Sequence, residues 1–184
     1  MIRSTLSAAL AATLLLAGCS DDTVQPSDGP DIVASPVEGA DDPAIELLTG
    51  EPDVGQWFYN ADVTEDYGPR ATFGQPNTDG VFTLACDGAT GELVLSRAGA
   101  LPSDDATEMR VVAESGQSRY TARASEGELP RIEARMALDD PFVETLAFIA
   151  EPFGILVEGA EPLLMPAPDD NLSRVIETCR GRAS

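Results

Sequence analysis

Alternation of apolar and polar side chains at period two is the feature that most constrains the fold of this chain. Residues 131–138 show it most clearly: apolar Ile132, Ala134, Met136 and Leu138 alternate with charged Arg131, Glu133 and Arg135. Successive side chains of a β-strand point to opposite faces of a sheet, so this segment is predicted to be a strand with one solvated face.

Shorter segments of the same kind recur along the chain and are separated by turn residues. Residues 81–86 place Phe82, Leu84 and Cys86 on one face, and after a turn at 87–91 a return strand at 92–97 is expected. Further strands are predicted at 56–59, 70–73, 107–114, 119–124, 153–158 and 162–165, with turns that include 76–80 and 115–118. Hairpins of this type build an antiparallel sheet.

Helical spacing replaces strand spacing at two places near the C-terminus. Residues 139–141, Asp-Asp-Pro, form a helix start before a short helix that ends ahead of Pro152. Acidic residues at 169–170 introduce a last helix, which Gly181 is predicted to end. Its apolar stripe is Leu172, Val175, Ile176 and Cys179.

The predicted fold class is therefore mainly β, with α+β character. We expect an antiparallel β-sandwich or a partly open barrel, with the short helix and the C-terminal helix packed on the sheet. Trp57, the single tryptophan, is interpreted as a core side chain rather than a ligand platform.

Residues 1–18 have the features of a cleaved signal. Arg3 precedes an uncharged, Ala- and Leu-rich run at 6–17, which is shorter than the ~20 residues needed to span a bilayer. The following Leu16-Ala17-Gly18-Cys19 resembles the lipobox of bacterial lipoproteins, which implies that Cys19 is the lipidation site and the mature N-terminus. The alternative is a chance cysteine in an ordinary secretory signal.

Residues 19–54 are acidic and rich in Pro, Gly and Ser, and no basic residue occurs between Arg3 and Arg70. Such a composition predicts a disordered linker, in which only residues 44–48 could form a helical turn. A flexible tether of ~35 residues reaches roughly 30 to 35 Å. Residues 55–184 are then expected to form one β-rich periplasmic domain.

The formal net charge of −21 arises from 32 acidic and 11 basic residues, all of the latter Arg. This charge disfavours nucleic-acid binding and electrostatic docking on anionic lipid. The sequence has no His, which excludes Ser-His-Asp and Cys-His catalysis and His-containing zinc sites, and no Lys, which excludes a phosphate-binding Gly-Lys loop. Acidic pairs at 104–105, 139–140 and 169–170 are interpreted as turn or capping residues, so we expect no catalytic residue, metal or cofactor.

Two cysteines remain once Cys19 is assigned to lipid. Cys86 and Cys179 are predicted to form a disulfide, because an even pair in an oxidising periplasm is typical of one. Closing a loop of about 90 residues stabilises the fold by roughly 4 to 5 kcal/mol in the chain-entropy model. The alternative, a reactive thiol, requires an electropositive setting, whereas Asp87 follows Cys86.

Several segments together resemble an uncharacterised family of small alphaproteobacterial lipoproteins of the sphingomonad type, over about residues 56 to 181. The segments are Phe82-Thr83-Leu84-Ala85-Cys86, residues 93–97, Asp140-Pro141-Phe142 and residues 174–180. The pairing of a strand cysteine with a C-terminal helix cysteine is more distantly similar to β-sandwich domains of the invasion-associated locus B type and of type VI secretion accessory proteins. These resemblances imply fold and a cell-envelope location only. By family analogy, Ser20 after Cys19 favours the outer membrane over the inner membrane.

Two hypotheses for function follow from these patterns. The first is a non-enzymatic envelope lipoprotein, attached to the membrane through its lipid, that binds a protein partner or has a structural role, and that is a monomer. The second is an inhibitor of a basic hydrolase such as lysozyme. Residues 115–120 are similar to the motif of small β-barrel lysozyme-inhibitor lipoproteins, with one extra residue, which makes Arg119 and Tyr120 candidate partner contacts.

The arginines of the second half of the chain admit two interpretations. They form either a local basic strip or, as we expect, cross-strand ion pairs with nearby glutamates. The residues concerned are Arg119, Arg123, Arg131 and Arg135.

Overall fold

A computed structural model describes residues 41–62, 68–101, 103, 105–125 and 128–182, all within the unit formed by residues 31–184. It contains three helices, α1 (Pro43–Leu48), α2 (Phe142–Phe148) and α3 (Asn171–Arg182). The strands are β1 (Gln56–Asn60), β2 (Arg70–Gly74), β3 (Phe82–Cys86), β4 (Leu93–Ala98), β5 (Thr107–Ala113), β6 (Gly116–Ala124), β7 (Arg131–Met136), β8 (Phe153–Val157) and β9 (Leu163–Met165).

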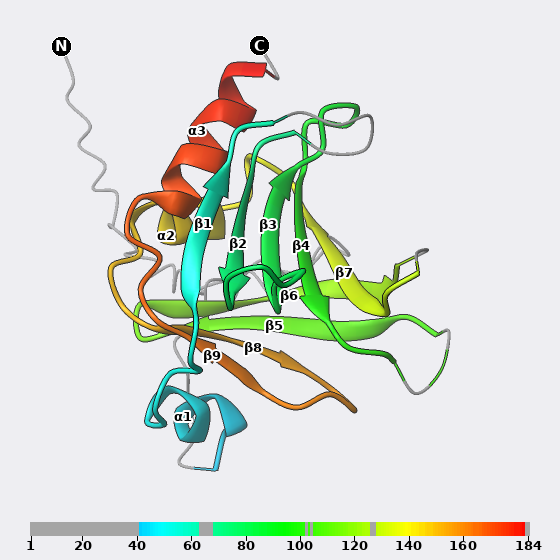
Figure 1. Ribbon diagram of the computed structural model, residues 1–184. Coiled ribbons are helices and arrows are strands. Elements are labelled where there is room, and N and C mark those ends of the chain that lie inside the picture. The colour runs from blue at the N-terminus through cyan, green and yellow to red at the C-terminus, as the bar shows by residue number, and fades with distance from the viewer. Residues whose placement is uncertain (1–40, 63–67, 102, 104, 126–127, 183–184) are drawn as a thin grey trace, which may run out of the picture. The chain divides into compact units, whose positions relative to one another are not determined.

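All nine strands belong to a single antiparallel sheet in the order β1-β2-β3-β4-β7-β6-β5-β8-β9. The sheet curls into a half-barrel, and strands β1–β4 cross the directions of β5, β6, β8 and β9 (Figure 1). The mainly β prediction is confirmed, in the form of the partly open barrel.

The predicted alternation sets the register of the central strands. In the β3–β4 pair, Leu84 lies opposite Leu95 and Cys86 lies opposite Leu93, and all four side chains are at most 1% exposed. On β7, the inward residues Ile132, Ala134 and Met136 are buried to the same extent, while its charged residues face outward. Burial of one face of each strand therefore fixes which residues pair, because a slip by one residue would expose the whole apolar set.

Aromatic side chains fill the inside of the curl. Trp57 of β1 packs against Phe73, Phe82 and Phe153, with ring centroids 5.4, 6.1 and 5.9 Å away. Its indole Nε1 donates a hydrogen bond of 3.0 Å to the Pro166 carbonyl after β9. Trp57 is half-buried and packs against the main core cluster, so it links the two edges of the sheet as a packing side chain at the margin of the core.

Helix α3 packs against β1, β2, β3 and α2, and its predicted stripe of Leu172, Val175, Ile176 and Cys179 is buried. The helix continues through Gly181 to Arg182 instead of ending at Gly181. Glycine is tolerated in a last turn, and arginines there interact favourably with the negative end of the helix dipole. Helix α2 begins at Phe142, one residue later than expected, with Pro141 at the N-cap position. Asp140 Oδ1 still accepts a 2.8 Å hydrogen bond from the Phe142 amide.

Residues 41–54, assigned above to the linker, are part of the folded unit where the structure describes them. Helix α1 packs on β8, β5 and β9, and Ala44 is fully buried. Val112 of β5 and Leu164 of β9, two of the strands that α1 contacts, are 0% and 3% exposed although they do not belong to the main core cluster. The helical turn that the sequence allowed at 44–48 is therefore present as α1, and its packing on the sheet places folded residues ahead of the predicted boundary at residue 55.

The turn predicted at 115–118 is shorter than expected. Glu114 and Ser115 alone form it, and Ala113 pairs with Gly116, so residues 116–118 belong to β6. Gly116 has φ 148°, a value that favours glycine and closes the two-residue turn. Pairing with β5 outweighs the weak strand propensity of Gly, Gln and Ser.

Candidate functional site

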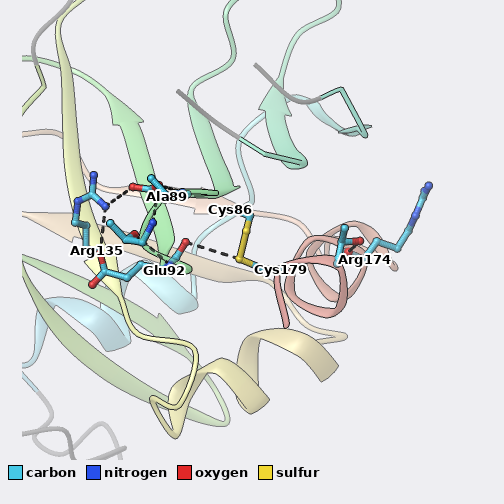
Figure 2. The surroundings of a disulfide bond; sticks show 9 residues. Cys86, Ala89, Glu92, Arg135, Arg174 and Cys179 are labelled. Atoms are coloured by element: carbon cyan, nitrogen blue, oxygen red, sulfur yellow. Dashed lines mark hydrogen bonds and ion pairs between the residues drawn. A yellow bond between two sulfur atoms is a disulfide. The ribbon is translucent and has the colours of Figure 1, made fainter. Parts of the chain in front are cut away.

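Among the predicted site residues that the structure describes, Cys86 and Cys179 are the two that it brings together. Cys86, the last residue of β3, is bonded to Cys179 of α3, 93 positions later, with the Cα atoms 5.5 Å apart (Figure 2). Both residues are at most 1% exposed. The predicted pairing is present, and it fastens the terminal helix to the inner face of the sheet.

The turn that follows Cys86 is organised by Asp87. Its Oδ1 accepts hydrogen bonds from the amides of Ala89 and Thr90, at 2.9 and 3.2 Å, and its carbonyl accepts one from Gly91 at 2.9 Å. Gly91 has φ 72°, which other residues adopt at a cost. This side-chain-capped turn explains why an aspartate directly follows the half-cystine.

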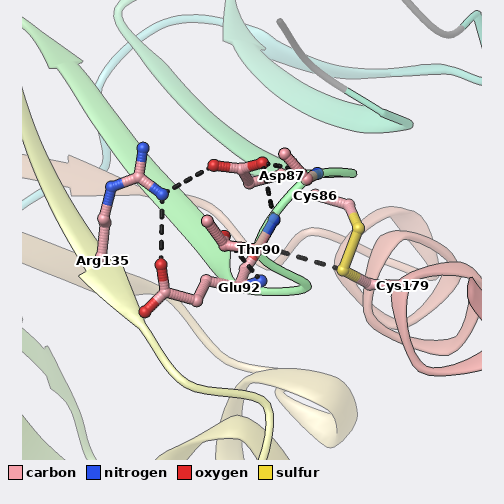
Figure 3. Close-up of polar contacts among 7 residues, drawn as sticks. Cys86, Asp87, Thr90, Glu92, Arg135 and Cys179 are labelled. Carbon is pink, nitrogen blue, oxygen red and sulfur yellow. Dashed lines mark hydrogen bonds and ion pairs between the residues drawn. A yellow bond between two sulfur atoms is a disulfide. The ribbon is translucent and has the colours of Figure 1, made fainter. Parts of the chain in front are cut away.

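Arg135 of β7 holds the same turn from the outer face of the sheet. Its Nη1 lies 2.7 Å from Asp87 Oδ2 and 3.2 Å from Glu92 Oε2 (Figure 3). The hydrogen bond from Arg135, helped by the amides of Ala89 and Thr90 and opposed by burial, lowers the pKa of Asp87 to about 2. The same contact raises the pKa of Arg135. Asp87 is therefore ionised and engaged in structure at neutral pH.

A hollow of about 260 Å³ lies beside the disulfide. It is lined by the two half-cystines, residues 87–91 and Arg182. Asp87 is the carboxylate there, and Arg135 already binds it. Among the residues described, this lining provides no nucleophile paired with a base, so we assign the hollow no catalytic role.

Arg119 and Tyr120 do not form a common surface. They are neighbours on β6 and therefore face opposite sides of the sheet. The Arg119 side chain is 54% exposed and lies 3.8 Å from Glu108, whereas Tyr120 is 8% exposed and packs in the core. Burial, with a smaller contribution from nearby Asp140, raises the pKa of Tyr120. A partner on the outer face would reach Arg119 only.

The other arginines of the outer face lie against neighbouring strands. Arg131 Nε donates to Ser96 Oγ at 2.7 Å, and its two Nη atoms donate to the carbonyls of Ser96 and Gly80. Arg123 lies opposite Glu133 in the β6–β7 register. The expected ion pairs with glutamates are present for Arg119 with Glu108 and for Arg135 with Glu92. Arg131, by contrast, contacts Ser96 and Gly80.

Sequence reasoning missed a charged cluster at the start of α1. Arg110 Nη2 lies 3.0 and 2.9 Å from the two carboxylate oxygens of Asp42 and 2.6 Å from Gln117 Oε1. The hydrogen bond from Arg110, with one from the Ala44 amide, lowers the pKa of Asp42. The only sequence signal was Asp42 before Pro43, a helix-start pattern that lay in the segment assigned to the linker.

Over the part of the chain that is described, no three His, Cys, Asp or Glu residues are placed to hold a metal ion. Over the same residues, no helix has the length and apolar character needed to cross a membrane. Cys19 and the predicted signal at 1–18 lie outside the described residues.

Comparisons with known proteins do not assign the chain to a family. No protein-family model, no curated protein and no solved structure matches the chain. The fold, the disulfide and the surface chemistry described above are therefore the basis for proposing a function.

Proposed function

We propose that this chain is a lipid-anchored protein of the bacterial cell envelope whose domain faces the periplasm as a non-enzymatic binding or structural module. The observation that carries the proposal is the bond between Cys86 and Cys179. Disulfides that join distant parts of a fold persist in oxidising compartments and are rare in the cytosol.

The N-terminal sequence supports attachment through lipid. A single early cation, Arg3, a 12-residue uncharged run and Leu-Ala-Gly before Cys19 have the order of a lipoprotein signal. A protein with a net charge of −21 is repelled by anionic headgroups, so acyl chains on Cys19 would provide the membrane affinity. Ser20 favours sorting to the outer membrane.

The contacts of the described carboxylates support a module rather than an enzyme. Asp42 and Asp87 bind arginines and cap local structure, and Asp140 accepts a hydrogen bond from the Phe142 amide just before α2. The hydrolase-inhibitor hypothesis gains no support from β6, because Tyr120 is buried while Arg119 is exposed.

Fractionation of cells that express the full-length chain tests the anchoring. Wild-type protein should appear in the membrane fraction and incorporate labelled palmitate. The C19S variant should lose both the label and the membrane attachment. The matched control is the C86S/C179S double variant, which keeps Cys19 and should remain labelled. Unlabelled wild-type protein in the soluble fraction would overturn the proposal.

A further inference from the structure

A surface groove lies at the β2–β3 turn, at the opposite end of β3 from the disulfide. One wall is Asp53 and Val54, which lead into β1, and the other is the β2–β3 turn from Gln75 to Val81. Phe73 and Leu163 contribute to its lining, and its volume is about 300 Å³. We call it the valine groove, after Val54 and Val81.

We propose that the valine groove binds a short basic segment of a protein partner, with an Arg or Lys side chain next to an apolar residue. The inference deepens the binding role proposed above and rests on it. Its grounds are exposed apolar side chains, an acidic rim and walls that are already fixed.

Two apolar side chains at the groove, those of Val54 and Val81, are exposed. Val54 is 88% exposed and Val81 is 40% exposed, and they are two of the five large hydrophobic residues exposed in the described chain. The groove lies between them, so one inserted side chain would contact both walls. Removing this apolar surface from water favours binding.

The rim of the groove is acidic. Asp53 and Asp79 line it, and in the described structure no hydrogen bond or ion pair engages the Asp79 carboxylate. The nearby cation is Arg97, which precedes Ala98, whose amide donates to the Val81 carbonyl. Arg97 is 8% exposed and donates to the carbonyls of Ala98 and Glu161. Asp53 already accepts a hydrogen bond from the Leu164 amide and interacts electrostatically with Arg97, so Asp79 is the rim carboxylate that remains available to a cation. The net charge of −21 also attracts basic partners.

Both walls are held in place by hydrogen bonds. The Asp53 amide donates to the Leu164 carbonyl at 2.7 Å, and the Leu164 amide donates to Asp53 Oδ2 at 3.0 Å. In the opposite wall, the Thr78 hydroxyl donates to the Gln75 carbonyl at 2.8 Å, and Gly80 has φ 70°. A Cβ at Gly80 would lie 2.2 Å from Thr72 Cγ2. A preformed groove binds without an ordering cost to the protein.

The size of the groove limits its occupant. A volume near 300 Å³ is at the lower end of the range of about 300–1,000 Å³ for ligand pockets. It accommodates one or two side chains of a linear segment rather than a folded surface. An Arg or Lys fits this shape, because its aliphatic stem can lie on the valines while its charge meets the rim.

The proposal is tested by isothermal titration calorimetry, in which two blocked peptides are titrated into the full-length chain in detergent. One peptide is acetyl-Gly-Leu-Arg-Leu-Gly-amide, and the other has Gln in place of Arg. The Arg peptide should bind at least about fivefold more tightly than the Gln peptide. D79N, which removes rim charge, and V81S, which removes apolar wall, should each weaken binding of the Arg peptide at least about threefold.

Two matched variants control for general charge and hydrophobicity. E177Q removes an exposed acid from α3 and F148S removes an exposed aromatic side chain from α2, and each should change binding less than about twofold. Equal binding of the two peptides, an equal loss in E177Q, or no binding at about 1 mM peptide would each overturn the proposal. Palmitate labelling of Cys19 is independent of this result, so failure of the groove and failure of the anchoring are distinguishable.

Discussion

Asp42 and Arg110 are joined by an ion pair with 2.9 Å between Oδ2 and Nη2, although 68 positions separate them in the chain. Both side chains are 15% exposed. Asp42 also caps α1, since its Oδ1 accepts a 2.9 Å hydrogen bond from the Ala44 amide. One carboxylate thus caps the start of α1 and fixes the helix to β5. The last residues of the acidic N-terminal segment therefore belong to the folded domain.

Replacement of Asp42 by Ala should destabilise the domain. D42A removes the cap and leaves Arg110 largely buried without its carboxylate, which we expect to cost about 2–3 kcal/mol of unfolding free energy. D42N is the matched control, because Asn retains the cap and loses only the charge, so its loss should be smaller. Urea unfolding measures both. Equal stability of D42A and wild type would show that α1 is not docked as described.

Gly154 of β8 provides a second test of α1 docking. A Cβ at this position would lie 2.4 Å from Leu47 Cδ2, so G154A should destabilise the fold by about 1–3 kcal/mol through overpacking. L47A removes the clashing atoms. In a double-mutant cycle, the cost of G154A should therefore fall by about 1 kcal/mol when Leu47 is already Ala. Strict additivity of the two changes would contradict contact between α1 and β8.

The contribution of Asp87 should depend on pH. Its pKa is lowered from 3.8 to about 2 in the folded protein, so the stabilisation is present above the unfolded value and is lost as pH falls from about 4 to about 2. Its size is about 1–2 kcal/mol after allowance for the half-exposed Arg135. The difference in unfolding free energy between wild type and D87N should shrink over that interval. D169N, at an exposed carboxylate, controls for the loss of one surface charge.

Loss of the Cys86–Cys179 disulfide should lower stability markedly. The loop it closes spans 93 positions, and removal of a native disulfide of this kind costs roughly 2–5 kcal/mol. The C86S/C179S variant and reduced wild type should therefore unfold at similarly lower denaturant concentrations. An unchanged midpoint after reduction would show that packing alone holds α3 on the sheet.

The strands and the disulfide could be predicted from the sequence because both depend on local periodicity. Period two placed Cys86 inward on β3, and helical spacing placed Cys179 on the buried stripe of α3. Two cysteines that both face one core have few alternatives to pairing. The same periodicity implies that Arg119 and Tyr120 face opposite sides of the sheet, because adjacent residues of a strand alternate between faces.

The docking of α1 and the valine groove could not be predicted in the same way. Each depends on residues that come together only in the folded chain. Asp42 pairs with Arg110 in one case, and Val54 and Val81 line opposite walls of one groove in the other. Composition averaged over residues 19–54 also concealed Ala44, whose burial depends on β8 rather than on its neighbours in sequence.

The intact mass of the protein, purified from the membranes of a lipoprotein-processing bacterium, tests the account most directly. We predict a chain that starts at Cys19, carries acyl groups there and has lost two hydrogens to the Cys86–Cys179 bond. A mass that retains residues 1–18, or one with an unmodified N-terminus and two thiols that react with iodoacetamide, would contradict it.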